Sequence, residues 1–156
     1  MFEGLSWAGR LGLLWVGIAL VLCAIYRRWA VLGLTVIAVA LADWSATGLK
    51  AVFDRERPPL VWREPEPLVS VPSTGSFPSG HAATSFAGAT ILAFAFPRLA
   101  PLLYVLAAAV SFSRVYGGVH FPLDVVGGAV LGVVIAIALR QLVRVRQRSL
   151  RARQSG

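Results

Sequence analysis

The sequence predicts an all-α protein, a polytopic bundle of about five membrane-spanning helices. Hydrophobic residues make up 57% of the 156-residue chain, and charged residues only 14%. The mean hydropathy of +0.73 lies far above that of an ordinary soluble domain. The apolar residues gather in long runs, which arginines, prolines and glycines separate. This pattern and the chain length predict one integral membrane domain over residues 1–156.

Five apolar segments are the predicted spans. At about 1.5 Å per residue, a run of sixteen to eighteen residues covers roughly 24–27 Å, less than a ~30 Å hydrocarbon core. The shorter runs are therefore expected to reach into the interface or to lie in a thinned bilayer. The segments are 11–26 (alternatively from residue 5), 29–53, 79–96, 101–116 and 122–143.

Local signals bound these segments. The first ends in CAIYRRW with no A-x-A-like cleavage site after it, so we expect a retained span rather than a signal peptide. The single cysteine, Cys23, lies inside this run and is expected to be a packed or lipid-facing residue. Pro78 suits a first helical turn, and Ser79 is the expected N-cap of the third segment. Pro122 begins the fifth segment.

Small residues predict close contact between helices. The fifth segment contains GGAVLG, in which Gly128 and Gly132 form a G-x-x-x-G pattern, and the third contains GHAATSFAGA. Such residues let helix backbones approach one another. We interpret both stretches as packing surfaces within the monomer rather than as a dedicated dimer face. The oligomeric state is left open.

The net charge of +8 is distributed as a membrane topology predicts. If the chain crosses the membrane back and forth through the five spans, one side receives Arg27, Arg28, Arg98 and the C-terminal arginines. The positive-inside rule assigns this side to the cytoplasm. Residues 144–156 are expected to be a basic cytoplasmic tail that touches anionic lipid head groups. No aromatic residues interleave the C-terminal cluster, so a nucleic-acid surface is not expected. That cluster is Arg140, Arg144, Arg146, Arg148, Arg151 and Arg153.

The loop from Asp54 to Pro78 then faces outward from the cytoplasmic membrane. Its twenty-five residues include six prolines, and a loop of that length is usually functional or disordered. Its arginines lie on the side where the positive-inside rule does not expect them, so we treat them as functional candidates. They are Arg55, Arg57 and Arg63, partly balanced by Asp54, Glu56, Glu64 and Glu66.

Three clusters of polar residues lie at the outward ends of the spans. The first is Lys50-x6-Arg57-Pro58, which taken alone is typical of interfacial charges that snorkel to water. The second is Pro78-Ser79-Gly80-His81, where the open N–H groups and positive dipole end of a helix make an anion site. An ordinary helix cap with an interfacial histidine is the alternative for this motif.

The third cluster is SRVYGGVHFPLD, which contains Ser113, Arg114, His120 and Asp124. A carboxylate four residues after a histidine can accept its Nδ1–H and leave Nε2 free. The alternative is a favourable acid in the first turn of a helix. A zinc site on the two histidines and Asp124 has suitable ligands, but three neighbouring cations would repel the metal. We therefore expect neither a metal nor another cofactor.

Taken in order, the three clusters resemble the full signature of the type 2 phosphatidic acid phosphatase superfamily. This superfamily includes membrane lipid phosphate phosphatases and, more distantly, vanadium haloperoxidases. The match runs from Lys50 to Asp124, about half of the chain, and no signature position is missing. The resemblance implies a bundle related to the helical core of acid phosphatases and vanadium haloperoxidases, with the motifs gathered at one end.

The resemblance also implies roles for individual residues. It implies that His120 is a nucleophile that forms a phosphohistidine, that Asp124 orients it, and that His81 protonates the leaving oxygen. It implies that phosphoryl oxygens are held by Lys50, Arg57, Ser79, Gly80 and Arg114. Common membrane members have six spans, with three before the lysine motif. We count two here, which predicts an external N-terminus and a cytoplasmic C-terminus.

The resemblance and the expected topology favour a metal-independent phosphatase that acts on a lipid phosphate at the extracytoplasmic face. A polyprenyl (undecaprenyl-type) diphosphate is our first choice of substrate, with phosphatidate and phosphatidylglycerol phosphate as alternatives. A vanadate-dependent haloperoxidase is disfavoured, because those relatives are soluble and much larger. A protein that only binds anionic lipids is the non-enzymatic alternative, although binding alone does not require both histidines and Asp124.

Overall fold

The computed structural model describes residues 3–62 and 66–154, with side chains from residue 12 onward. These residues form helices and no strand, which confirms the predicted all-α bundle. Arg63 and Glu64 of the predicted outer loop lie outside the described residues. The helices are α1 (Glu3–Tyr26), α2 (Trp29–Phe53), α3 (Pro58–Val61), α4 (Gly80–Ala95), the 3-10 helix η1 (Pro97–Leu99), α5 (Ala100–Tyr116) and α6 (Pro122–Gln154).

The five predicted spans correspond to α1, α2, α4, α5 and α6. Three helical stretches are long and apolar enough to cross a membrane, namely Trp29–Val61, Pro97–Tyr116 and Pro122–Gln154. The apolar part of α1, Gly12–Tyr26, is shorter, and α4 has 16 residues. The predicted total of about five spans is thus compatible with three clear crossings and two shorter helices.

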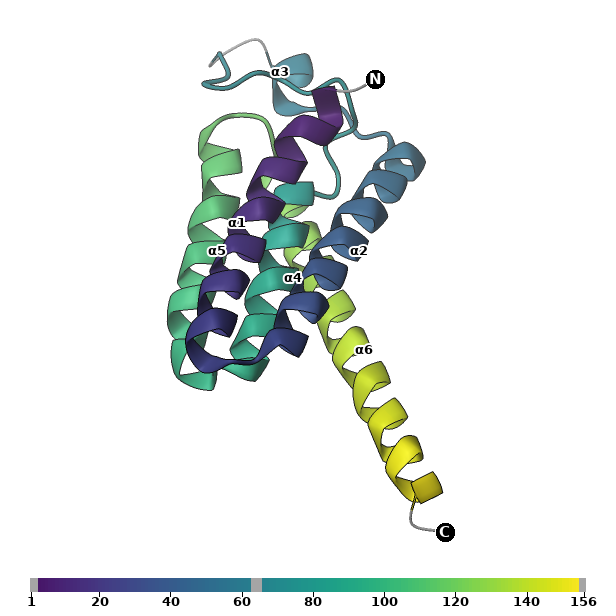
Figure 1. Ribbon diagram of the computed structural model, residues 1–156. Coiled ribbons are helices and arrows are strands. Elements are labelled where there is room, and N and C mark those ends of the chain that lie inside the picture. Colours follow the sequence, from purple (N-terminus) through teal and green to yellow (C-terminus); the bar gives the residue numbers. More distant parts are fainter. Residues whose placement is uncertain (1–2, 63–65, 155–156) are drawn as a thin grey trace.

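Helix α4 has 16 residues and lies at the centre of the bundle (Figure 1). It contacts α1, α2, α5 and α6, and twelve of its sixteen residues are buried. Most of the buried ones are alanine, glycine, serine or threonine, which allow four neighbours to approach one helix. Because the other helices surround it, α4 has little need of a lipid-facing apolar surface.

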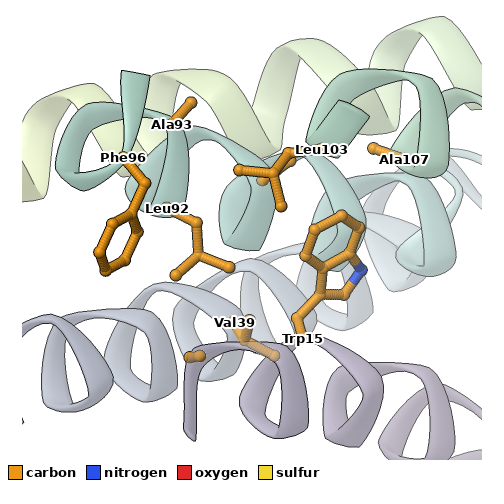
Figure 2. Packing of buried hydrophobic residues seen from close by; sticks show 9 residues of the cluster. Trp15, Val39, Leu92, Ala93, Phe96, Leu103 and Ala107 are labelled. Atoms are coloured by element: carbon orange, nitrogen blue, oxygen red, sulfur yellow. The ribbon is translucent and has the colours of Figure 1, made fainter. Parts of the chain in front are cut away.

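One apolar cluster fills the space between α1, α2, α4 and α5 (Figure 2). Trp15 of α1 is fully buried, and it packs on Gly88, where an added Cβ would lie 2.8 Å from the Cβ of Trp15. Burial of an aromatic side chain of this size is among the larger single contributions to a core. The other labelled members are Val39, Leu92, Ala93, Phe96, Leu103 and Ala107.

The predicted small-residue contact joins α4 and α6. A Cβ on Gly128 would clash with the carbonyl oxygen of Ser79, and one on Gly132 with that of Ala83. Both glycines therefore face α4 within the same chain. This confirms the interpretation of G-x-x-x-G as packing inside the monomer.

Helix α6 extends beyond the predicted span. The apolar run was predicted to end near Val143, and the helix continues through the predicted basic tail to Gln154. Hydropathy marks where the apolar run ends, not where the helix ends. Arginine, glutamine and leucine are good helix formers, and no glycine or proline interrupts them. Its 33 residues reach about 50 Å, so the basic part projects beyond the bundle (Figure 1).

The chain gathers its polar loops at one end of the bundle. The connection from α2 to α4, the start of α4 and the turn between α5 and α6 lie together, opposite the α1–α2 turn and η1 (Figure 1). The three signature clusters lie on these elements. Helix packing therefore brings together segments that are up to about seventy positions apart in the chain.

Candidate active site

His120 and Asp124 form the centre of the site. His120 lies in the turn between α5 and α6, and Asp124 lies in the first turn of α6. Both are buried, with 4% and 0% of their side chains exposed. The His120 Nδ1 lies 3.4 Å from the Asp124 Oδ2, and that oxygen accepts the backbone N–H of Phe121 at 2.8 Å. The histidine contact is electrostatic rather than an aligned hydrogen bond of the kind the spacing predicts.

Arg57 approaches the other nitrogen of the same imidazole. Its Nη1 lies 3.4 Å from the His120 Nε2 and donates to the carbonyl oxygen of Val119 at 2.8 Å. A guanidinium can only donate, so Nε2 must present its lone pair and the ring proton must sit on Nδ1, toward Asp124. This is the tautomer that a nucleophilic Nε2 requires.

Arg57 is buried, which contradicts the interpretation of its motif as interfacial charges that snorkel to water. The side chain is only 1% exposed and does not snorkel to water. Its Nε donates to the carbonyl oxygen of Thr74 at 2.9 Å, and its Nη2 to that of Gly75 at 3.2 Å. A buried guanidinium needs such partners. Arg57 thus joins the outer loop to the turn that carries His120.

The start of α4 lies beside this pair. The Ser79 backbone N–H donates to the carbonyl oxygen of Asp124 at 2.9 Å, which ties the second motif to the third. The first N–H groups of any helix lack an intrahelical acceptor, and α4 begins its own ladder only at Ala83. The N–H groups of Gly80 and His81 therefore remain free for an anion.

Ser79 occupies the predicted N-cap position but does not act as predicted. Its side chain makes no capping hydrogen bond, and its buried Oγ has no partner among the described residues. The same holds for the His81 Nε2 and the Arg114 Nε. Buried polar atoms are normally hydrogen-bonded. Three unsatisfied groups near one helix start indicate a site built for a polar ligand.

The positive groups of the site act on one another. His81 lies close enough to Arg114, Lys50 and Arg57 for each of these charges to act on its ring electrostatically. Burial lowers the pKa of the His120 imidazole below its ordinary value; the charges of Arg57 and Lys50 act in the same direction, and the contact with Asp124 opposes them. His120 is therefore neutral near pH 7, as a nucleophile must be.

Two further charged residues lie at the site: Arg55, which the sequence marked as a functional candidate without a site role, and Asp43, which was not singled out. Arg55 donates from Nη1 to the Asp124 Oδ1 at 2.8 Å, and its position on the unexpected side of the membrane was the available signal. Asp43 lies inside α2, and its Oδ1 is 3.8 Å from where a Gly80 Cβ would be; the Lys50 Nζ is 4.0 Å from the same point. An acid within an apolar span was its signal.

The donor set does not form a metal centre. Across residues 3–62 and 66–154, no group of three or more His, Cys, Asp or Glu side chains could hold a metal ion. The groups around the two histidines are instead lysine and arginine, together with a helix N-terminus. Such donors suit the oxygens of a phosphoryl group.

A family model described as the PAP2 superfamily matches residues 28–148 of the chain. The chain belongs to the PAP2 superfamily. The matched region contains every signature residue from Lys50 to Asp124. The family membership expected from the three motifs is thereby confirmed.

Known proteins similar to this PAP2 chain include an undecaprenyl-diphosphatase and a protein of solved structure. The undecaprenyl-diphosphatase of Sulfolobus acidocaldarius is 35% identical over 139 residues, which cover 82% of this chain and 63% of that protein. The chain therefore spans somewhat less than two thirds of that relative. The crystal structure of Aquifex aeolicus LpxE has a TM-score of 0.70 and 28% identity, covering 87% of this chain and 84% of that one.

A bacterial vanadium-dependent iodoperoxidase shares the fold. Its crystal structure has a TM-score of 0.75 at 20% identity, covering 84% of this chain and 38% of that one. This confirms the expected relation between the PAP2 bundle and the haloperoxidase core. The similarity concerns the arrangement of the helices, not the reaction.

Proposed function

We propose that this PAP2 protein is a membrane lipid phosphatase that hydrolyses a polyprenyl diphosphate through a phosphohistidine on His120. The observation that carries the proposal is that one end of the bundle holds both a neutral imidazole nitrogen and buried polar side-chain atoms without partners in the described part of the chain. The His120 Nε2 faces the Arg57 Nη1 at 3.4 Å, and the unsatisfied His81 Nε2 and Arg114 Nε belong to the same end of the bundle.

In the first step, the Nε2 of neutral His120 attacks the terminal phosphorus. The bond from phosphorus to the bridging oxygen breaks. His81, which takes up a proton when the anionic substrate binds beside it, gives that proton to the departing oxygen. Charge on the non-bridging oxygens is stabilised by Lys50, Arg57, Arg114 and the α4 N–H groups. Arg57 keeps its proton, and its Nη1–H hydrogen bond shifts from the His120 Nε2 to a phosphoryl oxygen as the N–P bond forms. Asp124 stabilises the positive charge that develops on the His120 ring.

In the second step, water attacks the phosphohistidine. His81, now neutral, accepts a proton from this water, and the N–P bond breaks to release inorganic phosphate and neutral His120. His81 ends this step protonated and gives the proton up as the anionic phosphate leaves the site. The balance needs no metal, oxidant or other co-reactant.

The choice of lipid rests on the relatives and on the surface of the bundle. The Sulfolobus acidocaldarius relative is named an undecaprenyl-diphosphatase. Large apolar side chains such as Leu20, Val105 and Val134 are exposed on the outside of the helices, which suits a substrate whose long tail stays in the bilayer. Phosphatidate and phosphatidylglycerol phosphate have the same combination of tail and terminal phosphate and are the alternative substrates.

The site is proposed to face the extracytoplasmic side of the cytoplasmic membrane, with the C-terminus in the cytoplasm. The signature residues lie at the end of the bundle opposite Arg28, Arg98 and the basic part of α6 (Figure 1). Single cysteines at exposed Ser73 and Ser149, in a Cys23→Ala background, test this with a membrane-impermeant thiol reagent on intact cells. Labelling only at position 73 would support the proposed orientation. Labelling only at position 149 would show the opposite orientation.

The deciding experiment is phosphate release by the purified protein in detergent. The panel contains a polyprenyl diphosphate, phosphatidate and phosphatidylglycerol phosphate, each measured beside His120→Ala. We expect the highest kcat/KM for the diphosphate and no turnover by the variant. Preference for another lipid would identify a different substrate. Phosphate release by His120→Ala would show that His120 is not the nucleophile. A folded protein that releases no phosphate but binds these lipids would support the non-enzymatic alternative.

A further inference from the structure

Arg55 holds the acid of the His120–Asp124 pair. Its Nη1 lies 2.8 Å from the Asp124 Oδ1, across 69 positions of sequence. The Asp124 side chain is fully buried, whereas 37% of the Arg55 side chain is exposed. A buried carboxylate is tolerated when it is paired and hydrogen-bonded. Arg55 is the cation that supplies this pairing from the outer surface.

The two oxygens of Asp124 have different partners. Oδ2 accepts the N–H of Phe121 at 2.8 Å and lies 3.4 Å from the Nδ1 of His120. Oδ1 accepts Arg55. A charge-assisted bond at this distance is among the stronger contacts a carboxylate can make. It fixes the rotation of the carboxylate plane and thereby the position of the oxygen that faces His120.

Arg55 is itself held in place. Its carbonyl oxygen accepts the N–H of Ser76 at 2.8 Å, and its guanidinium lies 4.3 Å from the centre of the Phe121 ring. Two residues further on, Arg57 reaches Val119 and His120 from the same segment. The R-x-R stretch therefore contacts residues 119–124 at two points. Arg57 binds Val119 before His120, and Arg55 binds Asp124 after it.

We propose that Arg55 is a positioning residue, which orients Asp124 against His120 and links the outer loop to the nucleophile. The proposal rests on the proposed function for the role of His120, but the contact itself does not. It predicts that Arg55 acts on the rate of the reaction rather than on substrate affinity, because it does not touch the open N–H groups of α4.

Removal of the Arg55 charge also has an electrostatic consequence. The other titratable groups of the site are Lys50 and Asp43 from α2, Arg57 from the loop, His81 from α4 and Arg114 from α5, while the described part of α1, Gly12–Tyr26, carries no charge. Without Arg55, the negative charge of Asp124 is less compensated and favours the protonated ring of His120. The acid limb of kcat/KM should then move to higher pH.

The test compares Arg55→Gln, Arg55→Lys and Arg55→Ala with the control Arg98→Gln. Arg98 is exposed at the opposite end of the bundle, and its loss changes the net charge equally. We expect Arg55→Gln to lower kcat about 10- to 100-fold, as for other residues that orient a reacting group, with KM within about threefold. Arg55→Lys should retain more activity, and Arg98→Gln should resemble the parent protein.

Chemical rescue separates positioning from a general structural role. Arg55 lines an open pocket of about 500 Å³, which admits a guanidinium ion. Millimolar guanidinium should restore part of the kcat of Arg55→Ala and have no such effect on His120→Ala. Unchanged kcat in Arg55→Gln, or a loss confined to KM, would overturn the proposal.

A measurement without turnover distinguishes this proposal from the proposed function. The pKa of His120, followed by NMR of ¹⁵N-labelled histidine in detergent, should rise in Arg55→Gln and stay unchanged in Arg98→Gln. That result would support the Arg55–Asp124–His120 link even if no lipid is hydrolysed. An unchanged pKa in a folded Arg55→Gln protein would refute the link even if the parent protein is an active phosphatase.

Discussion

The Nη1 of Arg57 lies 3.4 Å from the Nε2 of His120, although the two residues are 63 positions apart in the chain. The buried guanidinium also donates hydrogen bonds to the carbonyl oxygens of Thr74, Gly75 and Val119. One arginine thus sets the tautomer of the imidazole and holds the two loops that enclose it. A residue with both tasks is hard to replace.

Arg57→Lys should therefore abolish most of the activity. Lysine keeps the charge, but it lacks the planar fork that reaches three carbonyl oxygens and the imidazole together. We expect kcat/KM to fall on the order of 100-fold or more, with lower thermal stability. Steady-state kinetics and a thermal melt followed by tryptophan fluorescence check both effects. Parent-like values in both would show that only the charge matters.

Asp124→Asn should slow turnover while leaving the fold intact. The amide has nearly the same shape, but it carries no charge to stabilise the His120 ring as its nitrogen becomes positive. By analogy with other His–Asp pairs, we expect kcat to fall on the order of 10²- to 10⁴-fold. Circular dichroism controls for folding. A decrease of less than about threefold would show that His120 needs no partner.

The contact between α4 and α6 should be sensitive to a single methyl group. A Cβ at Gly128 would clash with the carbonyl oxygen of Ser79 at the start of α4. Gly128→Ala should therefore lower stability by about 1–3 kcal/mol and reduce activity. Gly17→Ala is the matched control, because a Cβ there meets nothing within 4 Å. Equal thermal melts for the two variants would contradict the packing that we describe.

The pH profile should reflect the lowered pKa of His120. The ring must be neutral to attack, and protonation inactivates it, so activity falls as the pH drops through this pKa. Burial and the charges of Arg57 and Lys50 place the pKa below the ordinary value, which is about 6.5. We expect the acid limb of kcat/KM to lie below that value. A limb above pH 7 would show that Asp124 outweighs the other groups.

Chelators should leave the activity unchanged. The reaction that we propose relies on Lys50, Arg57, Arg114 and helix N–H groups for charge stabilisation. Phosphate release measured after treatment with EDTA should equal that of the untreated protein. Loss of activity that zinc restores would return the two histidines and Asp124 to the metal-site interpretation.

Several features of the fold follow from local sequence. The predicted limits of the second span, Trp29 and Phe53, are those of α2, and the predicted starts and ends of α4 and α5 differ by at most one residue. Hydropathy and turn residues mark these limits, because apolar runs and helix-ending residues are properties of the local sequence. The three motifs identified the family because their order and spacing are also features of the sequence itself.

Other features could not be read from local sequence. The helical part of α6 beyond Val143 is polar, so hydropathy did not reveal it. Asp43 was visible as an acid in an apolar run, but its place beside Gly80 depends on how α2 packs against α4. The free Oγ of Ser79 depends on the path of the chain into α4 rather than on the preference of serine for N-caps.

The sequence by itself determined the helices, the family and the residue types that gather at one end of the bundle. Only the tertiary structure decided which of those residues touch. Arg55 and Arg57 are two positions apart and chemically identical, yet one binds the carboxylate of Asp124 and the other binds backbone carbonyls next to His120. The reason is that hydrogen-bond partners depend on distances between segments remote in sequence, which helix packing sets and local patterns do not encode.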